Sequence, residues 1–136
     1  MQKKVLVAEQ DITVWKVLEE HKRKKVITMT PYRYMEVPLH VLNGETPLVA
    51  KGKESVRESD GLNGTIIEGG FIHSFSDRDV AMGKMRYLQD LNDTAVAYEK
   101  VQVVVYECVI PKGTKYYVGL SNDIASKQIM FRKKIS

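Results

Sequence analysis

The sequence predicts an α+β domain, in which an antiparallel β-sheet carries one main helix on a face. Two observations predict the sheet. Val101–Ile110 reads VQVVVYECVI, a long run of apolar and β-branched residues, and a Pro-Lys-Gly turn separates it from the aromatic strand Thr114–Gly119. The basic run Gln128–Lys134 closes the chain as a further strand. The third observation is one amphipathic pattern of helical period after Ser76, which predicts the helix.

Three strands are expected at the start of the chain. Lys3–Ala8 is the first, and Ile12–Glu19 is the second because β-branched and aromatic residues dominate it. Val26–Met29 follows across a basic segment, so Glu19–Lys25 is expected to be the tip of a β-hairpin. Pro31 then breaks the ladder, because proline has no N–H to donate.

Residues 38–64 are predicted to form an irregular surface excursion, because proline and Asn-Gly or Asp-Gly pairs punctuate them. One short strand is expected inside it, at Leu48–Ala50. Thr65–Glu68 and Phe71–Phe75 follow as strand segments on the two sides of a two-glycine bend.

The helix is expected to begin at Ser76, a good N-cap, with acidic residues in its first turn and an end near Asn92-Asp93. Its apolar side is marked at i, i+4 and i+7 by Ala81, Met85 and Leu88.

The bulk properties suggest one domain over 1–136. A chain of 136 residues can bury a core without a metal or disulfides. Cys108 is the one cysteine and lies in the apolar strand, so we expect a buried reduced thiol, and such a thiol suits the cytoplasm. The short apolar run Val5–Ala8 cannot serve as a signal-peptide core, and no stretch approaches a membrane span, so no membrane partner is expected.

The formal net charge is +4, and two basic clusters, His21–Lys25 and Arg132–Lys134, carry much of it. A positive excess favours anionic partners such as nucleotides. The alternative is that both clusters are simply solvated, one at a hairpin tip and the other at a terminus.

No catalytic, nucleotide-loop or metal-ligand motif occurs. The three histidines are far apart and lack ligand spacing. We therefore expect no catalytic residues, no metal and no cofactor.

The first candidate binding group is Tyr32-Arg33-Tyr34 beside Pro31. A guanidinium can pair with phosphate oxygens and stack on a base, and tyrosines add aromatic faces. The alternative is a half-buried tyrosine pair with a solvated arginine.

The second group lies directly before the helix and contains Phe71, His73 and Phe75. Helix N-termini offer unpaired N–H groups to anions. The alternative is that both phenylalanines belong to the core and Ser76 only caps the helix.

The third group lies in the C-terminal turns and strands. Cationic, aromatic and amide side chains gather there, with one of the two adjacent tyrosines expected in the core and the other exposed. The group comprises Lys112, Lys115, Tyr116, Tyr117, Asn122 and Arg132.

Five stretches together resemble a group of small phage and prophage proteins with a "GFHSF" element and an "IPKGxxYYxG" ending. These are Trp15–Leu18, Pro31-Tyr32, Gly70–Phe75, Ile110–Gly119 and Ala125–Ile129. The chain departs from the pattern where Ile72 separates Phe71 from His73, and where Lys127-Gln128 stands in place of an asparagine.

The resemblance implies a non-enzymatic phage anti-defence protein similar to anti-Thoeris sponges, which trap cyclic ADP-ribose isomers or cyclic oligonucleotides without cleaving them. Such proteins are sheet-rich homo-oligomers, and the predicted excess of strand leaves sheet edges to cover. One alternative is a structural or protein-binding phage accessory protein. Another is an ADP-ribosyl-transfer-type enzyme, but the glutamate expected late in that family is absent from Ile124–Phe131.

Overall fold

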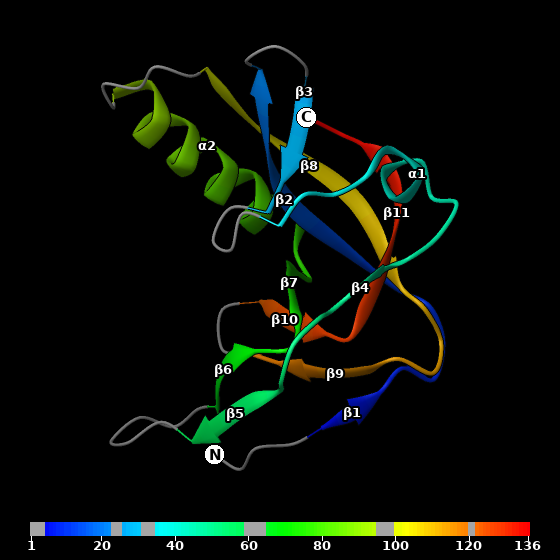
Figure 1. Ribbon diagram of the computed structural model, residues 1–136. Coiled ribbons are helices and arrows are strands. Elements are labelled where there is room, and N and C mark those ends of the chain that lie inside the picture. The colour runs from blue at the N-terminus through cyan, green and yellow to red at the C-terminus, as the bar shows by residue number, and fades with distance from the viewer. Residues whose placement is uncertain (1–4, 23–25, 31–34, 59–64, 95–99, 120–121) are drawn as a thin grey trace.

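The computed structural model describes residues 5–22, 26–30, 35–58, 65–94, 100–119 and 122–136, and these have the predicted α+β architecture (Figure 1). The helices are α1 (Leu39–Leu42) and α2 (Arg78–Thr94). The strands are β1 (Leu6–Val7), β2 (Ile12–Lys22), β3 (Val26–Met29), β4 (Leu48–Val49), β5 (Ser55–Glu58), β6 (Thr65–Gly69), β7 (Ile72–Phe75), β8 (Val101–Ile110), β9 (Lys115–Val118), β10 (Asp123–Ser126) and β11 (Gln128–Lys134).

Within the described part of the chain, nine strands form one antiparallel sheet. Its order is β1-β9-β10-β7-β2-β8-β11-β4, with β3 also paired to β2. β5 and β6 form a separate two-stranded hairpin. None of the helices in the described ranges is long and apolar enough to cross a membrane.

The long pair β2–β8 is the centre of the sheet. Their register runs without a break from Ile12 opposite Ile110 to His21 opposite Val101. The predicted bounds of β8 are confirmed, but β2 is longer than predicted and continues to Lys22. The extension is stabilised on both edges, because β3 pairs with Glu19–Lys22 on the side away from β8. Residues 23–25 of the expected hairpin tip lie outside the described part.

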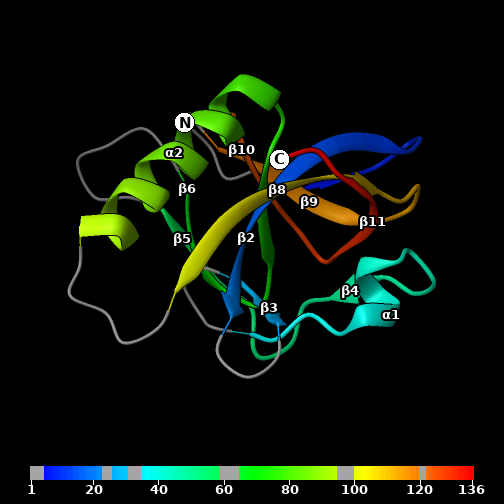
Figure 2. The ribbon, with the colours of Figure 1, turned by 90° about the horizontal axis from the view of Figure 1, so that it is seen from above.

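Alternation along β2 divides the core in two. Val14 and Leu18 point to one face, where they join the main core, which also contains the free, buried Cys108. Trp15 and Val17 point to the other face, which α2 covers (Figure 2). The predicted main helix therefore packs on the sheet as expected.

The excursion at 38–64 is more regular than the sequence predicted. It contains α1, β4 and β5, and it contributes the buried side chains Val41 and Leu48 to the main core. The short strand expected at Leu48–Ala50 is confirmed as β4, but the expectation that the rest of this segment is irregular and at the surface is wrong where α1 and β5 form and Val41 is buried. A four-residue helix and two short strands are too brief to carry a recognisable apolar period. Residues 59–64 lie outside the described part.

The N-terminus of α2 is capped one residue later than predicted. The Asp77 carboxylate accepts a hydrogen bond from the Val80 backbone N–H at 3.1 Å. The Ser76 hydroxyl instead donates to the Asn122 carbonyl oxygen, also at 3.1 Å. Asp77 is therefore the N-cap, because its side chain satisfies a free N–H of the first turn.

The C-terminal third contains one strand that the sequence did not predict. β10 lies between β9 and β7 and pairs with both. Its Ile124 and Ala125 are buried. Strands of four residues between turn signals leave little period to detect.

Candidate functional site

The edge of β2 that faces away from β8 changes its partner along its length. Trp15 pairs with Phe75 of β7, and Glu19 is the first residue to pair with β3. Residues 16–18 have no strand partner on this edge in the described part of the chain. β3 and β7 therefore leave β2 as the two arms of a fork (Figure 1), and the strand pairing places Lys16 between them.

A cavity of about 510 Å³ lies at this fork, and we call it the fork cavity. Its size falls within the range of roughly 300–1,000 Å³ that is typical of small-molecule sites. Its walls come from β2, two residues after β3, the segment after β4, the β6–β7 bend, β7, α2 and the start of β10. The lining residues are Lys16, Thr30, Met35, Ala50, Lys51, Gly70–Phe75, Lys84 and Asp123.

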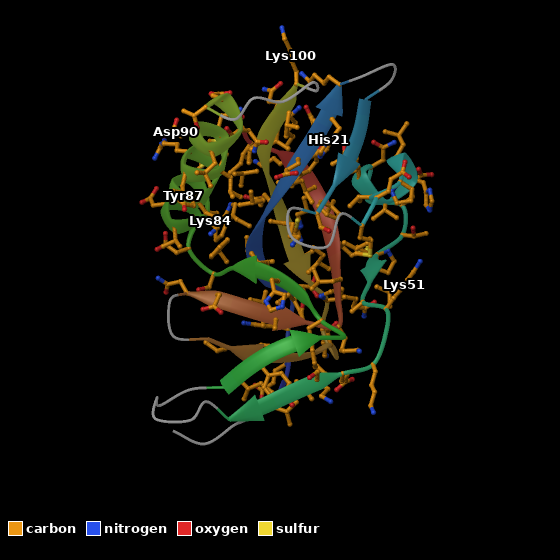
Figure 3. The ribbon with its side chains drawn as sticks, turned by 60° about the vertical axis from the view of Figure 1, so that its left-hand side comes forward. His21, Lys51, Lys84, Tyr87, Asp90 and Lys100 are labelled. Atoms are coloured by element: carbon orange, nitrogen blue, oxygen red, sulfur yellow. The ribbon has the colours of Figure 1, made fainter. Side chains whose placement is uncertain are left out.

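The fork cavity combines aromatic walls with an excess of cationic groups. Phe71 and Phe75 line it, and so do three lysines against one aspartate, Asp123. Lys84 comes from α2 and Lys51 from the segment after β4, and Figure 3 shows the two on different sides of the molecule. This composition suits a ligand that has an aromatic or apolar body and an anionic group.

Lys16 is the most unusual residue of the fork cavity. It lies between Val14 and Leu18 on the inward face of β2 and is only 7% exposed. Its ammonium donates a hydrogen bond to the His73 backbone carbonyl at 2.6 Å, where β7 has left the β2 ladder. Burial lowers the pKa of Lys16 from 10.5 to about 8, an effect that the Cys108 thiol partly opposes.

Ser74 is the second buried polar group at the fork cavity. It is 1% exposed, and its hydroxyl has no hydrogen-bond partner among the described residues. A buried hydroxyl without a partner costs free energy, on the order of 1–3 kcal/mol. Such a group at a cavity wall is available to a ligand.

A charged cluster supports the Phe71 side of the fork cavity. The Glu54 carboxylate bridges the ammonium groups of Lys115 and Lys127 at 2.9 and 3.1 Å. Both ammonium groups lie over the Phe71 ring, 5.9 and 5.0 Å from its centroid, and Tyr117 meets the ring edge-on at 5.4 Å. The hydrogen bond from Lys115 is the main cause that lowers the pKa of Glu54. This cluster holds the segment after β4 against the phenyl ring.

Gly70 allows that contact. Its φ is +76°, and a Cβ atom there would lie 2.7 Å from the Glu54 Cα. Its carbonyl oxygen accepts a hydrogen bond from the Lys127 ammonium at 2.8 Å. The predicted two-glycine bend is therefore required both by backbone conformation and by space.

The structure brings part of the predicted site together. Phe71, His73 and Phe75 line the fork cavity, and Lys115 and Tyr117 pack on Phe71 beside it. The other described candidates, Lys112, Tyr116, Asn122 and Arg132, are not among its lining residues. Tyr32, Arg33 and Tyr34 lie outside the described part.

The two adjacent tyrosines do not divide as expected. Tyr117 is buried against Phe71, and Tyr116 is partly buried against the main core. The expectation that one of them is exposed is wrong, because the curved sheet has packed material on both faces at this point.

The candidate binding residues chosen from the sequence do not include Lys16 or Ser74, although each had a signal. Lys16 interrupts an inward-facing alternation of apolar residues in ITVWKVL, a position where a charge is costly. Ser74 likewise occupies an inward-facing position of β7, two residues after the buried Ile72 and on the same face. A polar residue in an apolar register is a hint of a site, but it identifies no partner.

The described residues contain no group of three or more His, Cys, Asp or Glu side chains that could hold a metal ion. The chain matches no protein-family model, no curated protein and no solved structure. The case for a function therefore depends on the fork cavity itself.

Proposed function

We propose that this protein binds a small anionic ligand of nucleotide type in the fork cavity and sequesters it without changing it. The observation that carries the proposal is the composition of the cavity. About 510 Å³ of space is bounded by two phenylalanines and three lysines. Nucleotides need these two features together, since their bases stack on aromatic rings and their phosphates attract cations.

Among anionic nucleotides, the resemblance to small phage proteins suggests a signalling nucleotide as the ligand. We propose a cyclic nucleotide signal, such as a cyclic ADP-ribose isomer or a cyclic oligonucleotide, and a role in phage anti-defence. Sequestration requires a preformed cavity and no nucleophile or general base. The net charge of +4 supports the proposal because it accelerates encounter with an anion.

We also propose that the protein is a homo-oligomer. β1 lies at the outer edge of the sheet order, and the apolar side chains of Val5 and Val7 are exposed there, with Val118 of the adjacent β9 also exposed. Exposed apolar edge strands invite pairing with another chain. Light scattering at micromolar concentration tests this, and a single species of 15.5 kDa would contradict it.

The test of the proposed function is calorimetric titration with cyclic ADP-ribose isomers, cyclic dinucleotides and linear ADP-ribose. We expect saturable binding of at least one of them, and intact ligand after overnight incubation and denaturation of the protein. Recovery of a linear or hydrolysed product would show an enzyme instead. Absence of binding across the panel at millimolar concentration would contradict the nucleotide proposal.

A cavity-filling variant shows whether binding occurs in the fork cavity. Ala50 lines it, so Ala50→Trp places a large ring in the space and should abolish binding. Lys112→Trp is the matched control for the added ring, because Lys112 is exposed and is not a lining residue. Equal binding by Ala50→Trp and the parent would place the ligand elsewhere.

A further inference from the structure

The floor of the fork cavity contains a buried cation with unused hydrogen-bonding capacity. A lysine ammonium has three N–H donors. The His73 carbonyl is the one acceptor recorded for Lys16 within the described ranges. Within the described ranges, Cys108 is the titratable neighbour that influences its pKa, and no carboxylate contributes to that pKa. Two N–H donors of Lys16 therefore have no acceptor among the described residues.

A second donor lies on the adjacent strand, on the same face. Trp15 pairs with Phe75, so the next residues in the antiparallel direction are Lys16 and Ser74. Both are inward-facing by alternation, and both line the fork cavity. Ser74 is 1% exposed, and its hydroxyl has no described partner. A buried donor and a buried cation thus face the same space.

We propose that the Lys16 ammonium and the Ser74 hydroxyl form an anion subsite that binds phosphoryl oxygens of the ligand. This inference rests on the proposed function, because it names the part of the fork cavity that recognises the charged group. Hydrogen bonds from a charged donor to phosphate are short and about twice as strong as neutral ones. An anion there would satisfy both groups and neutralise a charge that burial otherwise penalises.

The charged side chains that line the fork cavity with Lys16 are mostly cationic. Lys84 on α2 and Lys51 after β4 line it, and Asp123, the first residue of β10, is the acidic side chain among its described lining residues. The titratable imidazole of His73 on β7 also belongs to a lining residue. From β8, Tyr106 lies opposite Lys16 in the ladder. The Cys108 thiol, also on β8, is a titratable neighbour that influences the pKa of Lys16. Burial raises the pKa of both β8 groups, so they stay neutral near pH 8.

The subsite has a protonation signature. Burial lowers the pKa of Lys16 to about 8, and an anion in contact with it raises that pKa, because the anion favours the charged form. Binding near pH 8 is therefore accompanied by proton uptake. The affinity for an anion is constant well below pH 8 and falls as the pH rises above 8.

The experiment observes the side chain itself. The protein is labelled with 13C at lysine Cε, and Lys16 is assigned by the signal that Lys16→Met removes. The pH titration of Lys16 is recorded in inorganic phosphate and in sodium chloride of equal ionic strength. We expect phosphate to raise the titration midpoint of Lys16 by at least about 0.5 pH unit relative to chloride. Lys112, an exposed lysine away from the cavity, should not respond.

Two variants complete the test. Ser74→Ala should reduce the effect of phosphate on Lys16, and Lys16→Met should weaken binding of ADP-ribose at least tenfold at pH 7, whereas Lys112→Met should not. An unchanged Lys16 midpoint in phosphate, or an equal change at Lys112, overturns the subsite whether or not nucleotides bind. A phosphate response at Lys16 without nucleotide binding leaves the subsite in place and overturns the proposed function.

Discussion

Replacing Lys16 by methionine should make the protein more stable at neutral pH. Methionine keeps the unbranched side chain that fills this part of β2 and removes the charge. Lys16 is 7% exposed, and burial lowers its pKa from 10.5 to about 8. A group whose charged form is disfavoured in the fold destabilises the native state wherever that form is populated.

The magnitude follows from the two pKa values. Below pH 8 the Lys16 ammonium is charged in both the folded and the unfolded chain, so the folded state bears the full cost of burying the charge. At roughly 1.4 kcal/mol per pH unit, the difference between pKa values of 10.5 and about 8 makes this cost about 3 kcal/mol. Loss of the charged donor to the His73 carbonyl lowers this gain by about 1.5 kcal/mol. We therefore expect Lys16→Met to stabilise the fold by about 2 kcal/mol at pH 7.

The gain should disappear at high pH. Between pH 8 and 10.5 the folded chain has lost the proton that the unfolded chain still binds, so the stability of the parent rises relative to the variant. At pH 10 the remaining penalty is about 1 kcal/mol, which the lost hydrogen bond cancels.

Urea denaturation of both proteins at pH 7 and at pH 10 tests this sign and magnitude, since the comparison cancels groups that titrate in both. A variant that is less stable than the parent at pH 7, or a difference that does not change with pH, would refute the reasoning. In that case the lysine would be well solvated or paired.

Three further perturbations test other parts of the structure. Gly70→Ala should lower the free energy of unfolding by about 2 kcal/mol or more, since the alanine would have to adopt a positive φ and its Cβ would clash with the Glu54 backbone. An unchanged urea midpoint would contradict this. Cys108 should react with a thiol reagent at pH 8 only after unfolding, because it is 0% exposed and burial raises its pKa; fast modification of the native protein would be the opposite outcome. Glu54→Gln should lower the melting temperature at low salt and pH 7 but not in 1 M salt, because Lys115 and Lys127 lose an exposed ionic partner. The same difference should fade as the pH falls through the lowered pKa of Glu54, and a salt-independent difference would indicate a packing effect instead.

The fold was predictable where the apolar period is long. β8 is an apolar strand of ten residues, and α2 is an amphipathic helix of seventeen. Both were predicted close to their observed bounds, because an apolar pattern of that length is easily recognised. α1 and β10, of four residues each, were not predicted. Their positions depend on tertiary contacts, such as the pairing of β10 with β7 and β9, that no local pattern encodes.

The candidate site was predictable only in part. The Phe71–Phe75 segment stood out because aromatic residues precede a helix, and three of its residues line the fork cavity as candidates. Lys16 could not be connected to that segment from the sequence, because the contact joins residues 57 positions apart and depends on the divergence of β7 from β2. The turn residue Lys112 attracted interest through its charge alone, and it lies outside the cavity lining.

The most direct test of the fork cavity is to follow the backbone amides of 15N-labelled protein during separate titrations with cyclic ADP-ribose isomers, cyclic dinucleotides and linear ADP-ribose. The account predicts saturable shifts concentrated at Lys16, Gly70–Phe75 and Lys84, with the affinity falling above pH 8. Shifts confined to the turn around Lys112 and the terminal strand at Arg132, or no saturable shift at all, would contradict it.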